Sequence, residues 1–344
     1  MMILLNPSKQ LFLFALLWGT LISISSNSWL GAWVGLEINL LSFIPIIMIS
    51  KNPMSTEAAL KYFLIQAFAS SILLFSFMLT QLTFNMNIMY QHNMFTFLMM
   101  SSLMLKLGVA PFHFWLPGTM EGLSWTNCII LMTWQKIAPL MLLSYLMNMN
   151  KFTYMMIIMS IIVGSIGGLN QTSTRKLMAY SSINHLGWMM SAMIAGENLW
   201  MTYFIIYSIM SLSVMLIFHS FQTSYISQNI MLLNKHPIIK FSLFTLLLSL
   251  GGLPPFLGFL PKWLVIQNLT QLSQFSLTTI MVMMTLITLF YYLRLTFSAF
   301  LLHSYNPQWN LNNSFNNWSM STTSITTSIS IILLFMPTIT WMTT

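Results

Sequence analysis

Long apolar segments recur along the whole chain and alternate with short polar connections. Each is close to the roughly 20 residues that a helix needs to cross the hydrocarbon core of a membrane. The pattern therefore predicts an all-α polytopic membrane protein of eleven spans, forming a single transmembrane domain over residues 1–344. The predicted spans are 9–27, 30–49, 57–80, 94–117, 122–147, 152–169, 174–195, 198–222, 238–268, 275–302 and 322–342.

The composition agrees with this interpretation. Hydrophobic residues make up 57% of the chain and charged residues 5%, with a mean hydropathy of +0.78. A soluble domain carries about 25% charged residues, so this chain cannot cover a water-exposed surface. The single cysteine, Cys128, excludes a disulfide framework or a cysteine-ligated cluster. Thirty-three methionines favour a genetic code with an extra methionine codon, which predicts an organelle-encoded protein.

The cations are distributed unevenly across the predicted membrane. With eleven spans, Lys151 alone falls on the side opposite the N-terminus. The N-terminal side holds Lys9, Lys51, Lys61, Arg175, Lys176, Lys235, Lys240 and Arg294. Loops facing the cytoplasm or the matrix carry such an excess, so the N-terminus is predicted there and the C-terminus on the opposite side. The net charge of +8 follows from this bias and requires no nucleic acid as partner.

Three lysines fall inside predicted spans: Lys106, Lys136 and Lys262. A lysine at the membrane centre costs about 2.5 to 3.5 kcal/mol on insertion scales, so such residues usually have a function. The alternative is that each amine reaches the headgroups along its flexible stem. Lys106 and Lys136 are too central for this, whereas the depth of Lys262 leaves both interpretations open.

Two segments repeat the same interruption of an apolar run. GVAPFHFWLP, residues 108–117, and GLPPFLGFLP, residues 252–261, share five of ten positions. Proline cannot donate the helical hydrogen bond and glycine loosens the backbone, so both helices are predicted to break. The residues of the predicted breaks are Gly108, Pro111, Gly251, Gly252, Pro254 and Pro255. A simple proline kink is the alternative for either segment alone.

The two breaks lie in the fourth and ninth spans, five spans apart. This spacing predicts two inverted repeats, spans 1–5 over about 9–147 and spans 6–10 over about 152–302, with the span at 322–342 as an extra C-terminal helix. Broken helices at matching positions favour an ion pathway near mid-membrane. Glu37 is the one carboxylate well inside a span, and it is either a structural acid or the partner of a lysine. Opening such an ion pair weakens the hold of the ammonium on its proton.

Several stretches resemble one known family closely and over most of the chain. They are residues 55–68 (STEAALKYFLIQAF), 104–117 (MLKLGVAPFHFWLP), 133–139 (TWQKIAP), 179–189 (AYSSINHLGWM) and 251–263 (GGLPPFLGFLPKW). In these the chain resembles the NADH dehydrogenase (ubiquinone) subunit 2 family of animal mitochondria, the antiporter-like membrane subunits of respiratory complex I.

The resemblance implies a proton-translocating subunit of a mitochondrial inner-membrane translocase that carries no redox chemistry of its own. It also implies that Glu37 pairs with Lys106, that Lys136 is the central lysine, and that Lys262 is the terminal one. His185 is a weaker candidate for a relay between Lys136 and Lys262, the alternative being a buried structural histidine. His113 and His219 are weaker candidates still.

The chain has no Gly-rich dinucleotide loop and no cysteine cluster, so we expect no cofactor or metal in it. NADH, FMN, iron–sulfur clusters and ubiquinone are expected on partner subunits. The expected partners are other membrane-arm and supernumerary subunits of complex I and membrane lipids. A haem between His185 and His219, a stand-alone cation/proton antiporter and a non-transporting scaffold remain as alternatives. Glu57, Glu121 and Glu197 are expected in solvent, Glu57 paired with Lys61.

Overall fold

A computed structural model describes residues 7–48, 52–85, 89–228, 237–301 and 328. In this part of the chain the regular elements are α-helices, apart from an isolated β-bridge between Ser173 and Tyr225. The predicted eleventh span, 322–342, lies outside the described residues except for Ser328. The chain divides into two compact units, residues 1–160 and 161–344.

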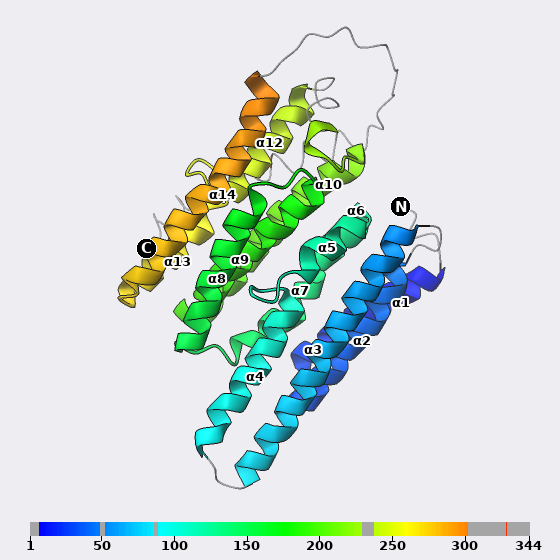
Figure 1. Ribbon diagram of the computed structural model, residues 1–344, viewed down its shortest axis with the longest axis vertical. Coiled ribbons are helices and arrows are strands. Elements are labelled where there is room, and N and C mark those ends of the chain that lie inside the picture. Colours follow the sequence, from blue (N-terminus) through cyan, green and yellow to red (C-terminus); the bar gives the residue numbers. More distant parts are fainter. Residues whose placement is uncertain (1–6, 49–51, 86–88, 229–236, 302–327, 329–344) are drawn as a thin grey trace. The chain divides into compact units, whose positions relative to one another are not determined.

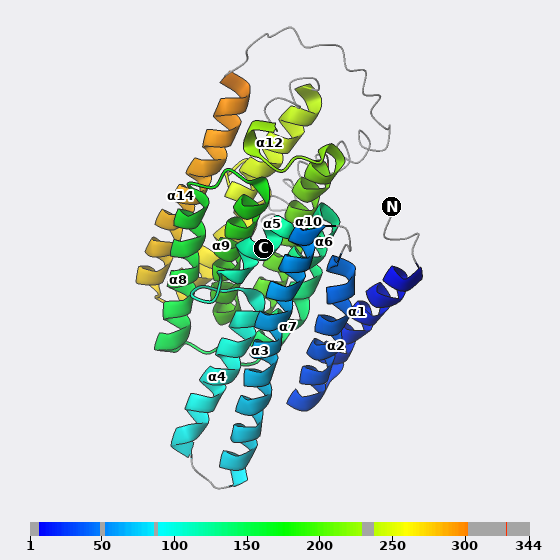
Figure 2. The ribbon, with the colours of Figure 1, turned by 45° about the vertical axis from the view of Figure 1, so that its right-hand side comes forward.

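The first unit is built on neighbouring pairs of helices. Its helices are α1 (Pro7–Ser25), α2 (Trp29–Ile47), α3 (Pro53–Asn85), α4 (Met89–Leu107), α5 (Trp115–Gly122), α6 (Trp125–Met132) and α7 (Trp134–Ser144). In this unit α1 packs on α2, α2 on α3, and α3 on α4, and the last pair lies side by side in both Figure 1 and Figure 2. Helix α7 contacts α1, α2 and α4, so it lies at the centre of the unit.

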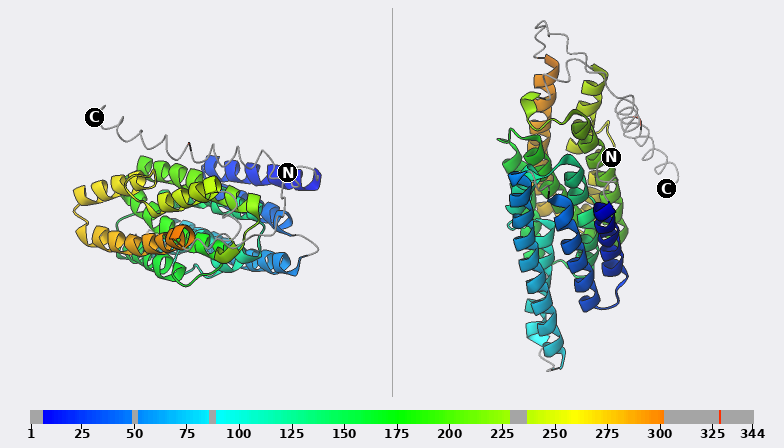
Figure 3. Two further views of the ribbon diagram at one scale, coloured as in Figure 1. Left: turned by 90° about the horizontal axis from the view of Figure 1, so that it is seen from above. Right: turned by 90° about the vertical axis from the view of Figure 1, so that its right-hand side faces the viewer.

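The boundary between the units falls within α8 (Lys151–Gly168). The second unit continues with α9 (Thr174–Ala195), α10 (Glu197–Phe221), α12 (Pro237–Gly251), α13 (Phe259–Gln271) and α14 (Phe275–Leu301). Helix α10 contacts α9, α12 and α13, while α14 runs along α12 and α13 (Figure 3). Helix α12, which ends at the second break, is the fourth described helix counted from α8. Helix α4, which ends at the first break, is likewise the fourth counted from α1.

Seven helices in the described part of the chain are long and apolar enough to cross a membrane. They cover Pro7–Ser25, Trp29–Ile47, Pro53–Leu82, Trp125–Ser144, Lys151–Gly168, Glu197–Phe221 and Phe275–Phe297. The broken segments supply the shorter apolar helices Met94–Leu107 and Phe241–Gly251. Helix α9 covers the predicted span 174–195 but is less apolar, because Ser, Asn and His replace aliphatic residues along it. The structure thus confirms an all-α protein of several spans, and the count of eleven stays a prediction.

Large apolar side chains point outward from these helices. Phe14 and Trp18 on α1 are each 63% exposed, and Phe75 on α3 is 60% exposed. In water this arrangement would be costly, whereas lipid tails solvate such side chains well. The outward faces are therefore suited to the hydrocarbon of a membrane.

Small hydroxyl residues fill much of the interior. Ser102 on α4 and Ser182 on α9 are fully buried, and each hydroxyl donates to the backbone carbonyl three residues earlier, at 2.7 Å. This local bond gives each hydroxyl a hydrogen-bond partner within its own helix. Helices can then pack closely while keeping polar atoms in the interior.

Candidate functional site: buried lysines at broken helices

The helices before the two predicted breaks end in the same way. Gly108 and Gly252 have φ angles of +77° and +84°, in the left-handed region that favours glycine. At the first break the N–H of Val109 donates to the carbonyl of Met104 at 3.0 Å. At the second the N–H of Leu253 donates across the same sequence separation, to Leu248 at 3.5 Å. Both helices thus end in a Schellman-type cap, formed at the glycine that opens each repeated segment.

After each break the prolines lie on the exposed side of the chain. Pro111, Pro254 and Pro255 are all exposed, and each precedes the start of the next helix. They prevent α4 and α12 from continuing, because a proline nitrogen has no hydrogen to donate. The three prolines therefore lie in the segments that follow the ends of α4 and α12, whereas Gly251 is still part of α12.

Protein groups satisfy the carbonyls that the breaks leave without helical partners. The indole nitrogen of Trp115 donates to the carbonyl of Leu105 at 3.1 Å, and Nε2 of Gln66 donates to that of Lys106 at 3.2 Å. At the second break the amine of Lys262 itself donates to the carbonyl of Gly251 at 2.8 Å. Irregular backbone within a membrane requires such partners. The second break therefore binds a cation directly.

A third break, next to Lys136, was not predicted. The expected span 122–147 corresponds to the candidate span Trp125–Ser144, in which Thr133 separates α6 from α7. Thr133 has φ −112° and ψ −68°, and its hydroxyl donates to the carbonyl of Ile129 at 2.8 Å. Such back-bonding by threonine bends helices. Pro139 further down α7 removes another helical hydrogen bond, so all three buried lysines lie near irregular backbone.

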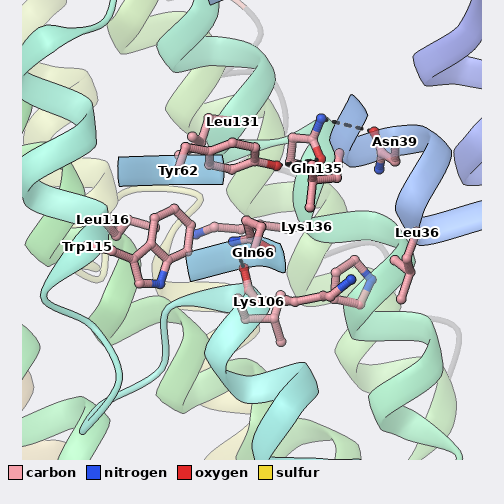
Figure 4. Close-up of a pocket in the computed structure, with 13 residues that line it drawn as sticks. Leu36, Asn39, Tyr62, Gln66, Lys106, Trp115, Leu116, Leu131, Gln135 and Lys136 are labelled. Carbon is pink, nitrogen blue, oxygen red and sulfur yellow. Dashed lines mark hydrogen bonds between the residues drawn. The ribbon is translucent and has the colours of Figure 1, made fainter. Parts of the chain in front are cut away.

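Lys106 and Lys136 line one cavity in the first unit (Figure 4). Lys106 is 7% exposed and Lys136 is 2% exposed, so neither reaches the surface of the unit. The cavity is lined by Leu36, Asn39, Leu40, Tyr62, Gln66, Lys106, Leu107, Trp115, Leu116, Leu131, Gln135, Lys136 and Pro139. The volume within it that the centre of a water molecule can occupy is about 20 Å³. About 10–15 Å³ by this measure holds one water, so the cavity has room for at least one.

Amide side chains line the same cavity and tie three helices together. Nε2 of Gln135 on α7 donates to Oδ1 of Asn39 on α2 at 3.0 Å. The hydroxyl of Tyr62 on α3 donates to Oε1 of Gln135 at the longer distance of 3.5 Å. Figure 4 shows the Lys136 side chain extending toward Trp115, away from the end of the Lys106 side chain. A proton passing between the two amines would therefore need a bridging water or amide.

Glu37 lies on α2 beside two residues of the cavity wall, Leu36 and Asn39. Its Oε2 is buried without a hydrogen-bond partner in the described structure. Both Glu37 and Lys106 belong to the described residues, and their side chains form no ion pair within 4.0 Å. The charge of Glu37 is close enough to act on the Lys106 ammonium. The predicted Glu37–Lys106 pair is therefore open in this conformation, and its closing stays a prediction.

Lys262 lies in the first turn of α13 and is 5% exposed. Besides its bond to Gly251, the amine lies 5.9 Å from the ring centroid of Trp188, within reach of a cation–π interaction. A Cβ on Gly252 would lie 2.8 Å from this amine, so the glycine also leaves space for it. For Lys262 the sequence left two interpretations open, a buried amine or an amine that reaches the headgroups. The structure shows a buried amine bound to the break.

His185 lies on α9 in the second unit and is 6% exposed. Its Nδ1 is 3.0 Å from the hydroxyl of Tyr203 on α10. The residue lines a cavity of about 10 Å³ together with Gly258 and Pro261, which follow the second break. The histidine thus borders the same segment that carries Lys262.

The remaining candidates do not line the cavity of Lys106 and Lys136 or that of His185. Nδ1 of His113 lies 3.2 Å from the carbonyl of Pro111, and Nδ1 of His219 lies 3.1 Å from the amide of Gln222. Glu57, Glu121 and Glu197 are exposed as predicted. The predicted Glu57–Lys61 ion pair is confirmed. Within the described residues, no three of His, Cys, Asp or Glu gather as metal ligands.

The sequence analysis missed the uncharged polar residues around the lysines and His185. Gln66 bonds to the Lys106 carbonyl and Tyr203 to His185, while Gln135 and Tyr62 line the cavity of the two lysines. None of the four is charged, so none was singled out. The one available signal was an amide inside an apolar span, as at Gln66 and Gln135. Buried amides in a membrane helix require hydrogen-bond partners, so this signal predicts a polar neighbour without identifying it.

Comparison with known proteins gives a consistent result. The family described as NADH:quinone oxidoreductase/Mrp antiporter, transmembrane, matches residues 26–288. NADH-ubiquinone oxidoreductase chain 2 of Anopheles gambiae is 57% identical over 325 residues, covering 94% of this chain and 95% of the relative. The protein of the same name from Aedes aegypti is 55% identical over 90% of this chain and 91% of its own. That of Lemur catta is 45% identical over 82% of each chain.

Solved structures share the fold at lower sequence identity. A chain of respiratory complex I from Thermus thermophilus, 23% identical, matches with a TM-score of 0.83 over 95% of this chain and 78% of its own. A chain of the Mrp complex from Dietzia sp. DQ12-45-1b, 13% identical, matches with a TM-score of 0.80 over 95% and 75%. This chain therefore belongs to the NADH:quinone oxidoreductase/Mrp antiporter transmembrane family, and within it to the NADH-ubiquinone oxidoreductase chain 2 proteins.

Proposed function

We propose that this chain is the proton-translocating core subunit of mitochondrial NADH:ubiquinone oxidoreductase. It moves protons across the inner membrane, while NADH, FMN, iron–sulfur clusters and ubiquinone act in partner subunits. The observation that carries this proposal is the shared cavity of Lys106 and Lys136, two buried cations beside broken helices. An isolated buried ammonium is costly, and it is retained where it has a function.

In the proposed mechanism, electron transfer in other subunits opens and closes the Glu37–Lys106 pair. Closing the pair brings the carboxylate to the ammonium and stabilises it, so opening the pair weakens the hold of Lys106 on its proton. The released proton passes to Lys136 through water in their shared cavity, and the amides of Gln135 and Asn39 supply hydrogen-bond partners for that water. His185 then relays it to Lys262, which connects to one side of the membrane.

The proposal also places the chain in the membrane. It assigns the N-terminus to the matrix, because the positive-inside excess lies on that side. Its partners are the neighbouring membrane-arm subunits, the supernumerary subunits and lipid. Labelling of an N-terminal tag in right-side-out and inverted membranes checks the orientation, and a tag accessible from the intermembrane space would reverse it.

Substitution of the buried lysines tests the function. The substitutions Lys106→Met, Lys136→Met and Lys262→Met keep the length of the side chain but remove the exchangeable proton. In the assembled complex in proteoliposomes, we expect each to lower proton pumping and quinone-linked turnover by about 10²-fold, as expected for loss of a proton-transfer group. Lys151→Met, which removes an exposed lysine at the start of α8, is the matched control.

The same experiment separates the alternatives. A non-transporting scaffold predicts that the three buried-lysine variants pump like the wild type, and this result would overturn the proposal. A stand-alone antiporter predicts that the chain alone exchanges sodium for protons in vesicles. Sodium prefers carboxylate and carbonyl oxygens, whereas the shared cavity presents two ammonium groups.

A further inference from the structure

An apolar cavity lies at one end of the second unit, where α9, α10, α12 and α14 each contribute to its wall. Thr174 is the one polar residue among the described residues that line it. Ile226 and Leu295 in the wall are half-buried, whereas the wall residues of α10 and α12 are buried, so the cavity lies closest to the surface at Ile226 and Leu295. Such a cavity offers water few hydrogen bonds and suits a hydrocarbon chain.

Positive charge adjoins this apolar wall. Arg175 and Lys176 lie in the first turn of α9, between two residues that line the cavity, and Arg294 directly precedes a lining residue of α14. In the sequence of residues 161–344, Glu197 is the one carboxylate side chain. It begins α10, and the wall of the cavity lies about 30 Å away, near the other end of that helix. The acidic side chains of this unit therefore do not balance the charge beside the cavity.

Two buried hydroxyl groups lie at the same end of α9. Ser173, the N-cap residue of α9, is 8% exposed, and Thr223 is 1% exposed. The hydroxyl of Thr174 donates to the carbonyl of Thr223 at 3.3 Å, so both residues lie next to the first residue of the helix. Neither the Ser173 nor the Thr223 hydroxyl has a hydrogen-bond partner in the described structure. A buried hydroxyl without a partner is costly, so these two favour a ligand that accepts hydrogen bonds.

The start of a helix is itself suited to an anion. Its first N–H groups have no partner within the helix, and the positive end of the helix dipole lies there, so phosphate groups bind at such ends. Helix α9 is 22 residues long, and the cations in its first turn form the stronger, charge-assisted hydrogen bonds with phosphate. Phosphate alone would leave the apolar cavity without a ligand. A phosphate ester with an acyl chain matches both parts.

We propose that this end of the second unit binds an anionic phospholipid. Its phosphate lies at the start of α9, where it accepts hydrogen bonds from the hydroxyls of Ser173 and Thr223 and is attracted by Arg175 and Lys176. One acyl chain enters the apolar cavity. The proposed orientation places this end at the matrix leaflet. This site goes beyond the proposed function and holds whether or not the buried lysines carry protons.

Photocrosslinking in the assembled complex tests the site. The probe is phosphatidylglycerol with a photoreactive diazirine in one acyl chain, added to the complex in phosphatidylcholine nanodiscs. Mass spectrometry should find the label on wall residues such as Leu177 and Phe244. A phosphatidylcholine probe with the same chains should label them about tenfold less, because it lacks the net negative charge. Unlabelled phosphatidylglycerol should suppress the label, and inorganic phosphate should not.

Two variants test the recognition of the headgroup. Replacing both Arg175 and Lys176 by glutamine should lower the label at the cavity about tenfold. Lys9→Gln, which removes a half-buried cation of α1 on the same predicted side of the membrane, is the matched control and should keep the label. Thr223→Val keeps the shape of the side chain and removes a hydroxyl with no hydrogen-bond partner in the described structure. It should assemble normally and lower the label about fivefold.

Three results would overturn the proposal. Equal labelling by the two lipid probes would show an apolar surface that does not recognise the headgroup. Suppression by inorganic phosphate would show a site for a free anion. Label on other parts of the complex but not at this cavity would show that another subunit covers it. The label on those other parts also reports whether each variant has assembled.

Discussion

At the scale of single residues, the site depends on small and uncharged groups as much as on its lysines. Gly252 provides both the left-handed turn that ends α12 and the space that Lys262 occupies. Gln66 and Trp115 satisfy carbonyls exposed at the end of α4. The charged residues are therefore held in place by neighbours that a search for charge alone overlooks.

Gly252→Ala tests this dependence. An alanine at φ +84° is strained by about 1–2 kcal/mol, and its Cβ would lie 2.8 Å from the Lys262 amine. We expect a complex that assembles but is less heat-stable and pumps fewer protons per NADH oxidised. Both quantities can be measured on the same purified preparation.

Gly118→Ala on α5 is its control, because a Cβ there meets no atom within 4 Å. If Gly252→Ala behaves like Gly118→Ala in both measurements, the second break does not position Lys262 as described.

At the scale of elements, α3 holds the broken end of α4 through one amide. Nε2 of Gln66 donates to the carbonyl of Lys106, and Gln66 is 5% exposed. The same amide lines the cavity shared by the two lysines of the first unit. Helix packing and the polarity of the cavity are thus linked through Gln66.

Gln66→Leu tests how much this bond between α3 and α4 contributes to stability. It leaves the Lys106 carbonyl buried without its partner, which costs about 1–3 kcal/mol, and it makes the cavity wall apolar. We expect a lower midpoint of thermal inactivation and slower pumping. Gln81→Leu, on an exposed position of the same helix, should change neither. Equal behaviour of the two variants would show that the Gln66 bond is dispensable.

Much of the element structure could be predicted from the sequence, for identifiable reasons. Apolar length predicts a spanning helix, and the paired Gly and Pro residues predict both breaks, because these residues act through the backbone alone. The interruption at Thr133 was missed because a threonine bends a helix only in some contexts. The partners of His185 and Lys106 were missed because they depend on which helices are neighbours, which periodicity does not determine.

At the scale of the whole molecule, the two units share one structural arrangement. Each has a helix that ends in a left-handed glycine and a buried lysine close to that end. The position of the lysine relative to the break differs between the units. Lys106 lies before its break and lines a cavity, whereas Lys262 lies after its break and bonds to the freed carbonyl. Lys106 and Lys262 are therefore held in different ways at corresponding helix ends.

The most direct test is to locate ordered water in the cavity between Lys106 and Lys136, in a structure of the assembled complex at a resolution that shows water. The account predicts at least one water there, hydrogen-bonded to one of the lysine amines and to the amides of Gln135 or Asn39. A cavity that is dry, or closed by apolar side chains in every state of turnover, would contradict it.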